Sequence, residues 1–197
     1  MSTKLLYQGH GSYRITAADG RVIYIDPYAG SGYEKPADIL LVSHQHGDHN
    51  KTEFVTQKTG CVVITNVEAI SGGVHNTFDI GGVVIEAVEA CNANHDPKLC
   101  VGFILTVDGI KIYIAADTSR TKSMESFACR NLDYALLPID GVYNMDSNEA
   151  AACARIIGAR VNIPVHMKPG GLFDKKLADA FDAPGKLVVS AGEEIEL

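Results

Sequence analysis

The chain has 197 residues, of which 46% are hydrophobic and 21% charged, so we expect one domain, residues 1–197, with a sizeable core. The formal net charge of −7 opposes binding to phosphate backbones, and no nucleic-acid partner is expected. The sequence shows no apolar run of transmembrane length, no signal-peptide pattern and no Cys-x-x-Cys pair among its five cysteines. We therefore expect reduced thiols, a cytoplasmic location and no membrane partner.

The first third of the sequence is rich in short β-type runs separated by Gly and Asp turns. These predicted strands are residues 4–8, 12–17, 21–26 and 38–43, and the last of them is a continuous apolar run. Residues 51–60 fit a short helix closed by Gly60, and residues 61–65 fit another buried strand. This opening predicts a sheet.

Strands and helices alternate later in the chain. Strands are predicted at residues 82–90, 99–117, 132–139, 159–165 and within 186–197, and Asp108-Gly109 marks a hairpin turn. Residues 146–159 form a predicted helix with Asp146 or Ser147 as N-cap, and residues 172–183 form the last helix. This pattern predicts two sheets with helices packed outside them.

The stretch "SHQHGDH" follows the apolar run at residues 38–43 and concentrates metal-ligand residue types. His44, His46, Asp48 and His49 fall within six positions. Imidazoles and carboxylates suit zinc and similar divalent ions. On an extended segment, residues two apart point the same way, so His44 and His46 can bind one ion together while Asp48 and His49 face a second. Gly47 permits a sharp turn between the pairs.

Two metal sites need further ligands, and three candidates stand where predicted strands end. His95 lies in a polar loop after the strand at 82–90, Asp117 ends the strand at 99–117, and His166 follows the strand at 159–165. Their shared location at strand ends favours a common site at one sheet edge.

The order of these motifs resembles the metallo-β-lactamase superfamily. Together with "GHGSYRI", "IDPY", "ALLPIDGVYNMDSNEAA" and "VNIPVHM", it is similar, more narrowly, to metal-dependent hydrolases related to L-ascorbate-6-phosphate lactonase. The resemblance implies an α/β (α+β) protein built as a four-layer αββα sandwich. It also implies a hydrolase that cleaves a small ester, lactone or phosphorylated metabolite with a hydroxide held between two metal ions.

The resemblance also implies a ligand set for two divalent ions, with zinc expected and manganese or iron as alternatives. The first ion would be held by His44, His46 and His95, the second by Asp48, His49 and His166, and both by Asp117. Asp48 would in addition orient the attacking water and collect its proton as a catalytic residue.

The sequence departs from the superfamily pattern at three places. The bridging motif reads Ala116-Asp117-Thr118 where Gly-Asp-Thr is more usual, and Asn144 stands where Thr is more typical. The segment before His95 is less Gly-rich than expected. Asn144 touches the predicted pocket wall and is a candidate substrate-binding residue.

Two other candidates leave alternatives open. His10 would contact substrate or donate a proton, or it is a turn histidine satisfied by the backbone. Lys168 in "HMKPGG" would offer a cation to an anionic small-molecule substrate, or it belongs to a surface loop.

Other functional interpretations compete with the small-molecule hydrolase. His-x-His-Gly-Asp-His is also similar to the motif of the phosphodiesterase ribonuclease Z, although the net charge of −7 argues against RNA binding. A metal-holding sensor without turnover is the third alternative. Only 31 residues follow His166, so a homo-oligomer could supply missing pocket walls.

Overall fold

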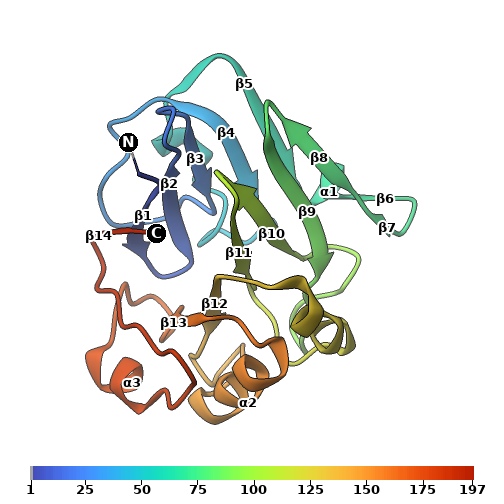
Figure 1. Cartoon of the computed structure of the whole chain (residues 1–197), viewed down its shortest axis with the longest axis vertical. Helices are drawn as coiled ribbons and strands as arrows, with labels where there is room; N and C mark the ends of the chain where they lie inside the picture. Colours follow the sequence, from blue (N-terminus) through green and yellow to red (C-terminus); the bar gives the residue numbers. More distant parts are fainter. Residues whose placement is uncertain (1) are drawn as a thin grey trace.

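The computed structural model describes residues 2–197 and contains two six-stranded sheets packed face to face (Figure 1). The first sheet has the order β14-β1-β2-β3-β4-β5, with β1 (Lys4–Gly9), β2 (Ser12–Thr16), β3 (Val22–Ile25), β4 (Ala37–Val42), β5 (Gln57–Thr65) and β14 (Glu193–Glu196). The second has the order β13-β12-β11-β10-β9-β8, with β8 (Thr77–Ile80), β9 (Val83–Glu89), β10 (Val101–Val107), β11 (Ile110–Ile114), β12 (Tyr134–Pro138) and β13 (Val161–Val165).

The remaining elements are short. They are the hairpin of β6 (Ile70–Ser71) and β7 (Val74–His75), the α-helices α1 (Asn66–Ala69), α2 (Ser147–Ile157) and α3 (Lys175–Ala180), and two 3-10 helices (Thr52–Phe54 and Lys122–Arg130). Among the described residues no helix is long and apolar enough to cross a bilayer.

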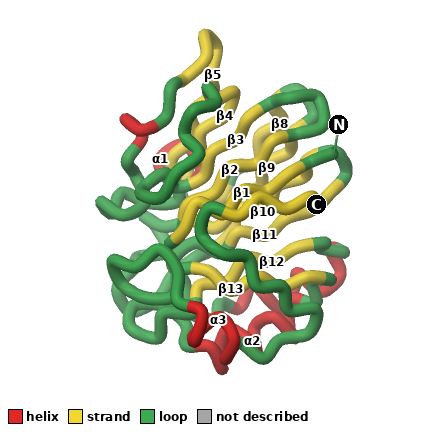
Figure 2. The backbone as a smooth tube through the Cα atoms, turned by 90° about the vertical axis from the view of Figure 1, so that its left-hand side faces the viewer, coloured by secondary structure: helices red, strands yellow, loops and turns green. Residues whose placement is uncertain are grey.

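Alternating side chains build the core between the sheets, because successive residues of a strand face opposite sides. On β4, Ile39 and Leu41 point into the space between the sheets, where they share a cluster with Phe103 and Leu105 of β10. Ile104 of β10 belongs instead to the cluster under the helices. Figure 2 shows the strands stacked above α2 and α3.

The two outer faces are covered differently. The cluster on the outer face of the second sheet includes residues of α2, α3 and the 3-10 helix Lys122–Arg130. On the first sheet, Tyr24 and Leu40 pack with Val55 and Tyr33 from loops, and the Tyr24 hydroxyl lies within hydrogen-bond distance of the carbonyls of Gly32 and Lys35. The predicted αββα sandwich is confirmed, but loops make up much of its layer over the first sheet.

The helix predicted at residues 146–159 is confirmed as α2, and the helix predicted at residues 51–60 is largely wrong. Asp146 is the N-cap of α2, and its carboxylate accepts from two backbone N–H groups. The helix predicted at 51–60 is wrong beyond one 3-10 turn, because Gln57 already begins β5 beside β4. Pairing with a buried neighbouring strand outweighs the local helix signal here.

The parallel strands direct their carboxyl ends to one edge of the sandwich. β3, β4 and β5 are parallel, and so are β11, β12 and β13. The loops that follow contain three non-glycine residues in the left-handed region, namely Asp26 (φ 47°), Ala116 (φ 57°) and His166 (φ 42°). Such conformations cost about 1–2 kcal/mol per residue and cluster at functional sites. The left-handed φ of Ala116 explains why glycine is the commoner residue before the aspartate.

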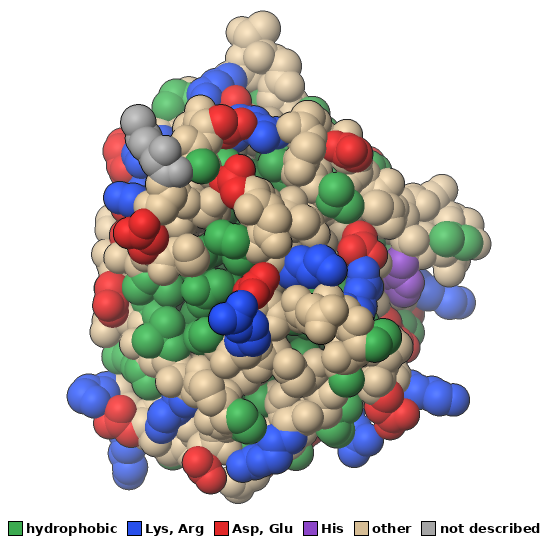
Figure 3. Space-filling view, viewed as in Figure 1, with side chains coloured by type: hydrophobic (Ala, Val, Ile, Leu, Met, Phe, Trp, Pro, Cys, Tyr) green, Lys and Arg blue, Asp and Glu red, His purple; other side chains and the backbone are tan. Residues whose placement is uncertain are grey.

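Charged side chains of both signs are mixed on the face shown in Figure 3, and apolar side chains lie between them. No large area of one sign is visible on that face.

Candidate metal centre

Three histidines from two loops form the first cluster. His44 and His46 follow β4, His95 follows β9, and one ring nitrogen of each lies within 4.8 Å of the others. The closest pair is His95 Nε2 and His46 Nδ1 at 3.1 Å. His44 and His95 are buried, and His46 is exposed. The predicted first ligand set therefore converges.

A second cluster lies beside the first and contains His10, Asp48, His49 and His166, with one ligand atom of each within 4.8 Å of the others. It combines all three residues predicted for the second ion with His10, which comes from the turn between β1 and β2. Asp48 is the accessible member, with 41% of its side chain exposed.

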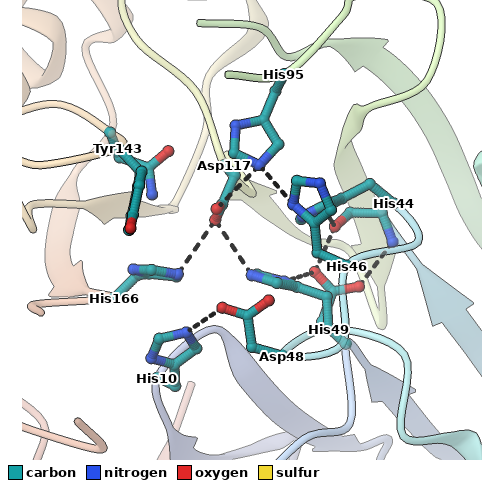
Figure 4. Close-up of polar contacts among 12 residues, drawn as sticks. His10, His44, His46, Asp48, His49, His95, Asp117, Tyr143 and His166 are labelled. Atoms are coloured by element: carbon teal, nitrogen blue, oxygen red, sulfur yellow. Dashed lines mark hydrogen bonds and ion pairs between the residues drawn. The ribbon is translucent and has the colours of Figure 1, made fainter. Parts of the chain in front are cut away.

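Asp117 lies between the two clusters and directs one carboxylate oxygen to each (Figure 4). Oδ1 is 3.3 Å from His49 Nε2 and 3.4 Å from His166 Nε2. Oδ2 is 3.4 Å from His95 Nε2. A single carboxylate thus contacts ligand residues of both clusters.

The atoms that face the centre have no partners of their own. Among residues 2–197, the Nε2 atoms of His44, His49 and His166 and Oδ1 of Asp117 are buried without a hydrogen bond. Buried polar atoms are nearly always paired, and leaving one unpaired costs about 1–3 kcal/mol. Lone pairs of imidazole and carboxylate that converge in this way fit a divalent cation.

Residues behind the clusters fix the histidine rings. His49 Nδ1 lies 2.9 Å from Asp26 Oδ2 and donates to it. His44 Nδ1 lies 2.9 Å from Ser43 Oγ, and that hydroxyl donates to Asp26 at 2.5 Å. Since Nδ1 of both rings is directed to these partners, Nε2 is the nitrogen that points inward, and it can bind a metal ion when it carries no proton.

Charge states at the centre also suit a cation. Burial, aided by the nearby His49, lowers the pKa of His44 to about 2, so its imidazole is neutral. Burial raises the pKa of Asp117, but His49 and His166 lower it more, so the pKa lies well below its usual range. A neutral imidazole and an ionised carboxylate are the metal-binding forms.

Comparison with known proteins identifies the family. Residues 4–166 match the beta-lactamase superfamily domain. The chain belongs to that superfamily. Its relatives include UPF0173 metal-dependent hydrolases from Alkaliphilus metalliredigens, 31% identical over 83% of this chain and 84% of theirs, and from Pyrococcus abyssi, 30% identical over 98% and 99%. It is thus a member of the UPF0173 metal-dependent hydrolase family.

Solved structures agree on the fold of this superfamily member. A protein from Parabacteroides distasonis described as a metal-dependent hydrolase is similar with a TM-score of 0.77 and 27% identity, over 95% of this chain and 92% of that one. Igni18, a metallo hydrolase from Ignicoccus hospitalis, also has a TM-score of 0.77, at 22% identity, over 100% and 99%. The narrower resemblance to L-ascorbate-6-phosphate lactonase stays a prediction.

His10 of this hydrolase contacts Asp48 and lines neither of the two cavities at the site, one of about 320 Å³ and one of about 340 Å³. The residue is fully buried, and its ring contacts Asp48 Oδ2 through Nε2 at 3.2 Å and the Gly171 carbonyl through Nδ1 at 3.1 Å. Both groups are acceptors, so a neutral imidazole can donate to only one of them. The contacts support a role through Asp48, and direct contact with substrate stays a prediction.

The other two predicted substrate contacts do not reach the cavities either. The Asn144 amide is buried and occupied by Asp140 and Asn92. Lys168 Nζ lies 3.3 Å from Asp174 at the start of α3, so its charge is already paired. Its predicted anion-binding role stays a prediction without support from these contacts.

Sequence reasoning missed the polar residues behind the ligands. Asp26 follows β3 of the first sheet and contacts His49. Asp140 follows β12 of the second sheet and contacts His166. Burial raises the pKa of Asp140, but His166 and three backbone N–H groups lower it to about 2. The available signal was an Ile-Asp pair at the end of each predicted strand, which also fits an ordinary turn.

Two cavities open at the ligands. One of about 320 Å³ is lined by His46, Asp48, Asn94, His95, Asp117, Tyr143, His166, Pro169 and Gly170. The other, of about 340 Å³, lies on the side of the first cluster and is lined by His44, Gln45, His46, Asn66, Asn94, His95, Asp96, Leu99 and Cys100. Both volumes fall at the lower end of small-molecule sites.

We expect zinc binding to release a proton from His49. Burial lowers the pKa of this imidazole, but Asp117 and Asp26 raise it more, so it lies well above its usual range and the ring is protonated at pH 7 without metal. The metal-binding form is neutral, so zinc affinity should rise with pH from 6 to 8 with about one proton released per chain. Calorimetry in buffers of different ionisation enthalpy measures that number.

Asp26→Asn is the matched variant for this prediction. It removes one of the two carboxylates that hold the His49 proton, so fewer protons should be released at pH 7. Buffer-independent heats together with a pH-independent zinc affinity in the wild-type protein would contradict the assignment.

Proposed function

We propose that the chain is a hydrolase with two divalent ions, expected to be zinc, that cleaves a small ester, lactone or phosphorylated metabolite. His44, His46 and His95 would hold one ion, Asp48, His49 and His166 the other, and Asp117 both. The observation that carries the proposal is Asp117, whose two oxygens lie 3.3–3.4 Å from ligand nitrogens of opposite clusters. Two ions bound there would supply an activated water and polarise the bond under attack.

Asp48 would take up the proton released by that water. It lines the cavity of about 320 Å³ and is much more exposed than the buried Asp117. The His10 hydrogen bond is the main cause that holds the pKa of Asp48 below its usual range, so the carboxylate is ionised at neutral pH and can accept. His10 also fixes the orientation of that carboxylate.

Tyr143 supplies a further polar group at the cavity. Tyr143 lines the cavity of about 320 Å³ together with Asp48, and its side chain lies beside His166 (Figure 4). Its phenol can donate a hydrogen bond to a substrate oxygen as negative charge develops there. The neighbouring Pro169 and Gly170 form a wall next to it.

Asp48→Asn tests the function. The amide keeps an oxygen ligand but is a far weaker base, so kcat for the best substrate in a panel of lactones, esters and phosphodiesters should fall by about 100- to 1,000-fold with bound metal retained. Asp182→Asn makes the same charge change at a fully exposed side chain and should leave kcat unchanged.

The panel also separates the competing functions. Preferred cleavage of phosphodiesters would favour a nuclease or phosphodiesterase. Two bound ions without turnover of any substrate would favour a metal-holding sensor.

A further inference from the structure

A continuous polar path runs behind the two clusters and joins one ligand of each. His95 Nδ1 lies 2.8 Å from Asn92 Oδ1, and Asn92 Nδ2 donates to Asn144 Oδ1 at 2.9 Å. Asn144 Nδ2 donates to Asp140 Oδ2 at 2.7 Å, and that oxygen lies 3.0 Å from His166 Nδ1. We call Asp140, Asn144 and Asn92 the relay.

The direction of every hydrogen bond in the relay is fixed from both ends, by Asp140 at one end and by the Asn94 backbone N–H, which donates to Asn92 Oδ1 at 2.8 Å, at the other. An ionised carboxylate only accepts, so Asn144 must turn its NH₂ group to Asp140 and its carbonyl to Asn92. Asn92 must then donate to Asn144 and present its own carbonyl to His95. Because Asn92 Oδ1 only accepts, His95 Nδ1 must donate to it. The lone pair of His95 is then on Nε2, which lies 3.4 Å from Asp117 Oδ2.

The same carboxylate acts on the other cluster. Asp140 Oδ2 lies 3.0 Å from His166 Nδ1 without forming a hydrogen bond to it, and the charge of the carboxylate favours the proton on that nitrogen. His166 Nε2 is then the free lone pair, buried without a partner and 3.4 Å from Asp117 Oδ1. One acceptor therefore influences a ligand on each side of the centre.

Asp140 is held rigidly enough to do this. Its Oδ1 accepts backbone N–H groups from Val142 and Tyr143, both at 2.7 Å, and from Asn144 at 3.2 Å. Asp140 and Asn144 are each 8% exposed. The chain turn after β12 thus fixes the carboxylate, and Oδ2 remains for the relay.

We propose that Asp140, acting through Asn144 and Asn92, holds the proton of both His95 and His166 on Nδ1, so that one carboxylate positions a metal ligand in each cluster. The relay residues are positioning residues, since Asp140 and Asn92 contact the ligand histidines and Asn144 joins the two. Partners of this kind typically change metal affinity by about 10- to 100-fold. The inference rests on the proposed pair of ions.

Asn144→Ala cuts the relay at its centre without touching either histidine. Asp140 keeps its place beside His166, and the Asn94 backbone N–H still donates to Asn92 Oδ1 at 2.8 Å, but the Asn92 NH₂ group loses its acceptor, so the side chain is held less firmly against His95. We expect zinc affinity, measured by competition with a chromophoric chelator, to fall about 10- to 100-fold for one of the two ions only. In ¹H–¹⁵N spectra of the zinc-loaded protein, the His95 Nδ1–H signal should be lost to exchange while that of His166 persists.

A rescue variant separates positioning from packing. In Asn92→Asp combined with Asn144→Ala, the carboxylate introduced at position 92 accepts from His95 whichever way it turns. Zinc affinity and the His95 signal should therefore recover, which a purely structural defect would not allow. Asn148→Ala, at an exposed position on α2 outside the relay, is the control, and Asn144→Leu replaces Asn144→Ala if the smaller side chain prevents folding.

The outcomes distinguish the two proposals. Two zinc ions in both the wild type and Asn144→Ala, with unchanged affinities and an unchanged His95 signal, would overturn the relay alone. Equal weakening of both ions, or no rescue by Asn92→Asp, would also overturn it. Fewer than two ions in the wild type would refute the proposed function, whatever Asn144→Ala does.

Discussion

Asp117→Asn should abolish almost all hydrolysis and most metal binding. The substitution removes the negative charge and one of the two oxygens that lie 3.3–3.4 Å from His49, His95 and His166, and the neutral amide cannot serve both clusters as a bridging anion. Metal ions contribute several kcal/mol of transition-state stabilisation, and about 5 kcal/mol corresponds to a loss of roughly 5,000-fold in kcat. Steady-state kinetics and elemental analysis measure the two effects.

The control for Asp117→Asn is Asp182→Asn, which makes the same change of charge at a side chain that is fully exposed. Circular dichroism should show that both variants fold. An Asp117→Asn protein that keeps two ions per chain and more than about a tenth of wild-type kcat would contradict the bridging role, because such a loss is only about 1.4 kcal/mol.

Removal of metal by a chelator should lower the melting temperature by roughly 8–16 °C and abolish activity. Buried polar atoms of His44, His49, His166 and Asp117 have no hydrogen-bond partner among the described residues, so bound ions stabilise the folded state strongly. Ligand at 1,000 times its Kd adds about 4 kcal/mol, and each kcal/mol shifts the melting temperature by about 2–4 °C for a chain of this size.

Both effects of the chelator should reverse when zinc is restored. Differential scanning calorimetry before and after dialysis against a chelator, with zinc added back to one half of the sample, measures them. An unchanged melting temperature with full activity after complete removal would show that the clusters are not a metal centre.

The ligand set could be predicted because its residues stand at or shortly after the ends of predicted strands. Parallel strands deliver their ends to one edge of a sheet, which places Asp117 and His166 after β11 and β13 at the same edge, and the packing of the two sheets brings His44 after β4 beside them. The structure brings all seven predicted ligands together in this way. Ligation itself stays a prediction, as does the single domain at residues 1–197.

The polar residues behind the ligand histidines could not be predicted, because their role depends on long-range contacts. Asp26 and Asp140 follow strands as ordinary turn residues do, and only the packed sheets show that each reaches a ligand histidine. Asn144 and Asn92 are 52 positions apart in the chain. No local pattern indicates such a pair.

The errors in the predicted secondary structure also arise from long-range contacts that a local sequence pattern does not show. The segment 51–60 contains helix formers, but Thr52, Val55 and Thr59 are β-branched, and β4 offers a buried strand with unpaired backbone groups. β5 therefore forms from Gln57, and Gly60, at φ 85°, lies in an irregular part of the pairing rather than at a helix end. The last helix is likewise shorter than predicted, Lys175–Ala180.

Metal content tests the central claim most directly. The protein would be purified without added metal, reconstituted with a modest excess of zinc, freed of unbound ions by gel filtration and measured by elemental analysis against protein concentration. The structure predicts about two ions per chain, one for each cluster around Asp117. A value near one would contradict the paired site, and a value near zero would contradict any metal centre formed by these residues.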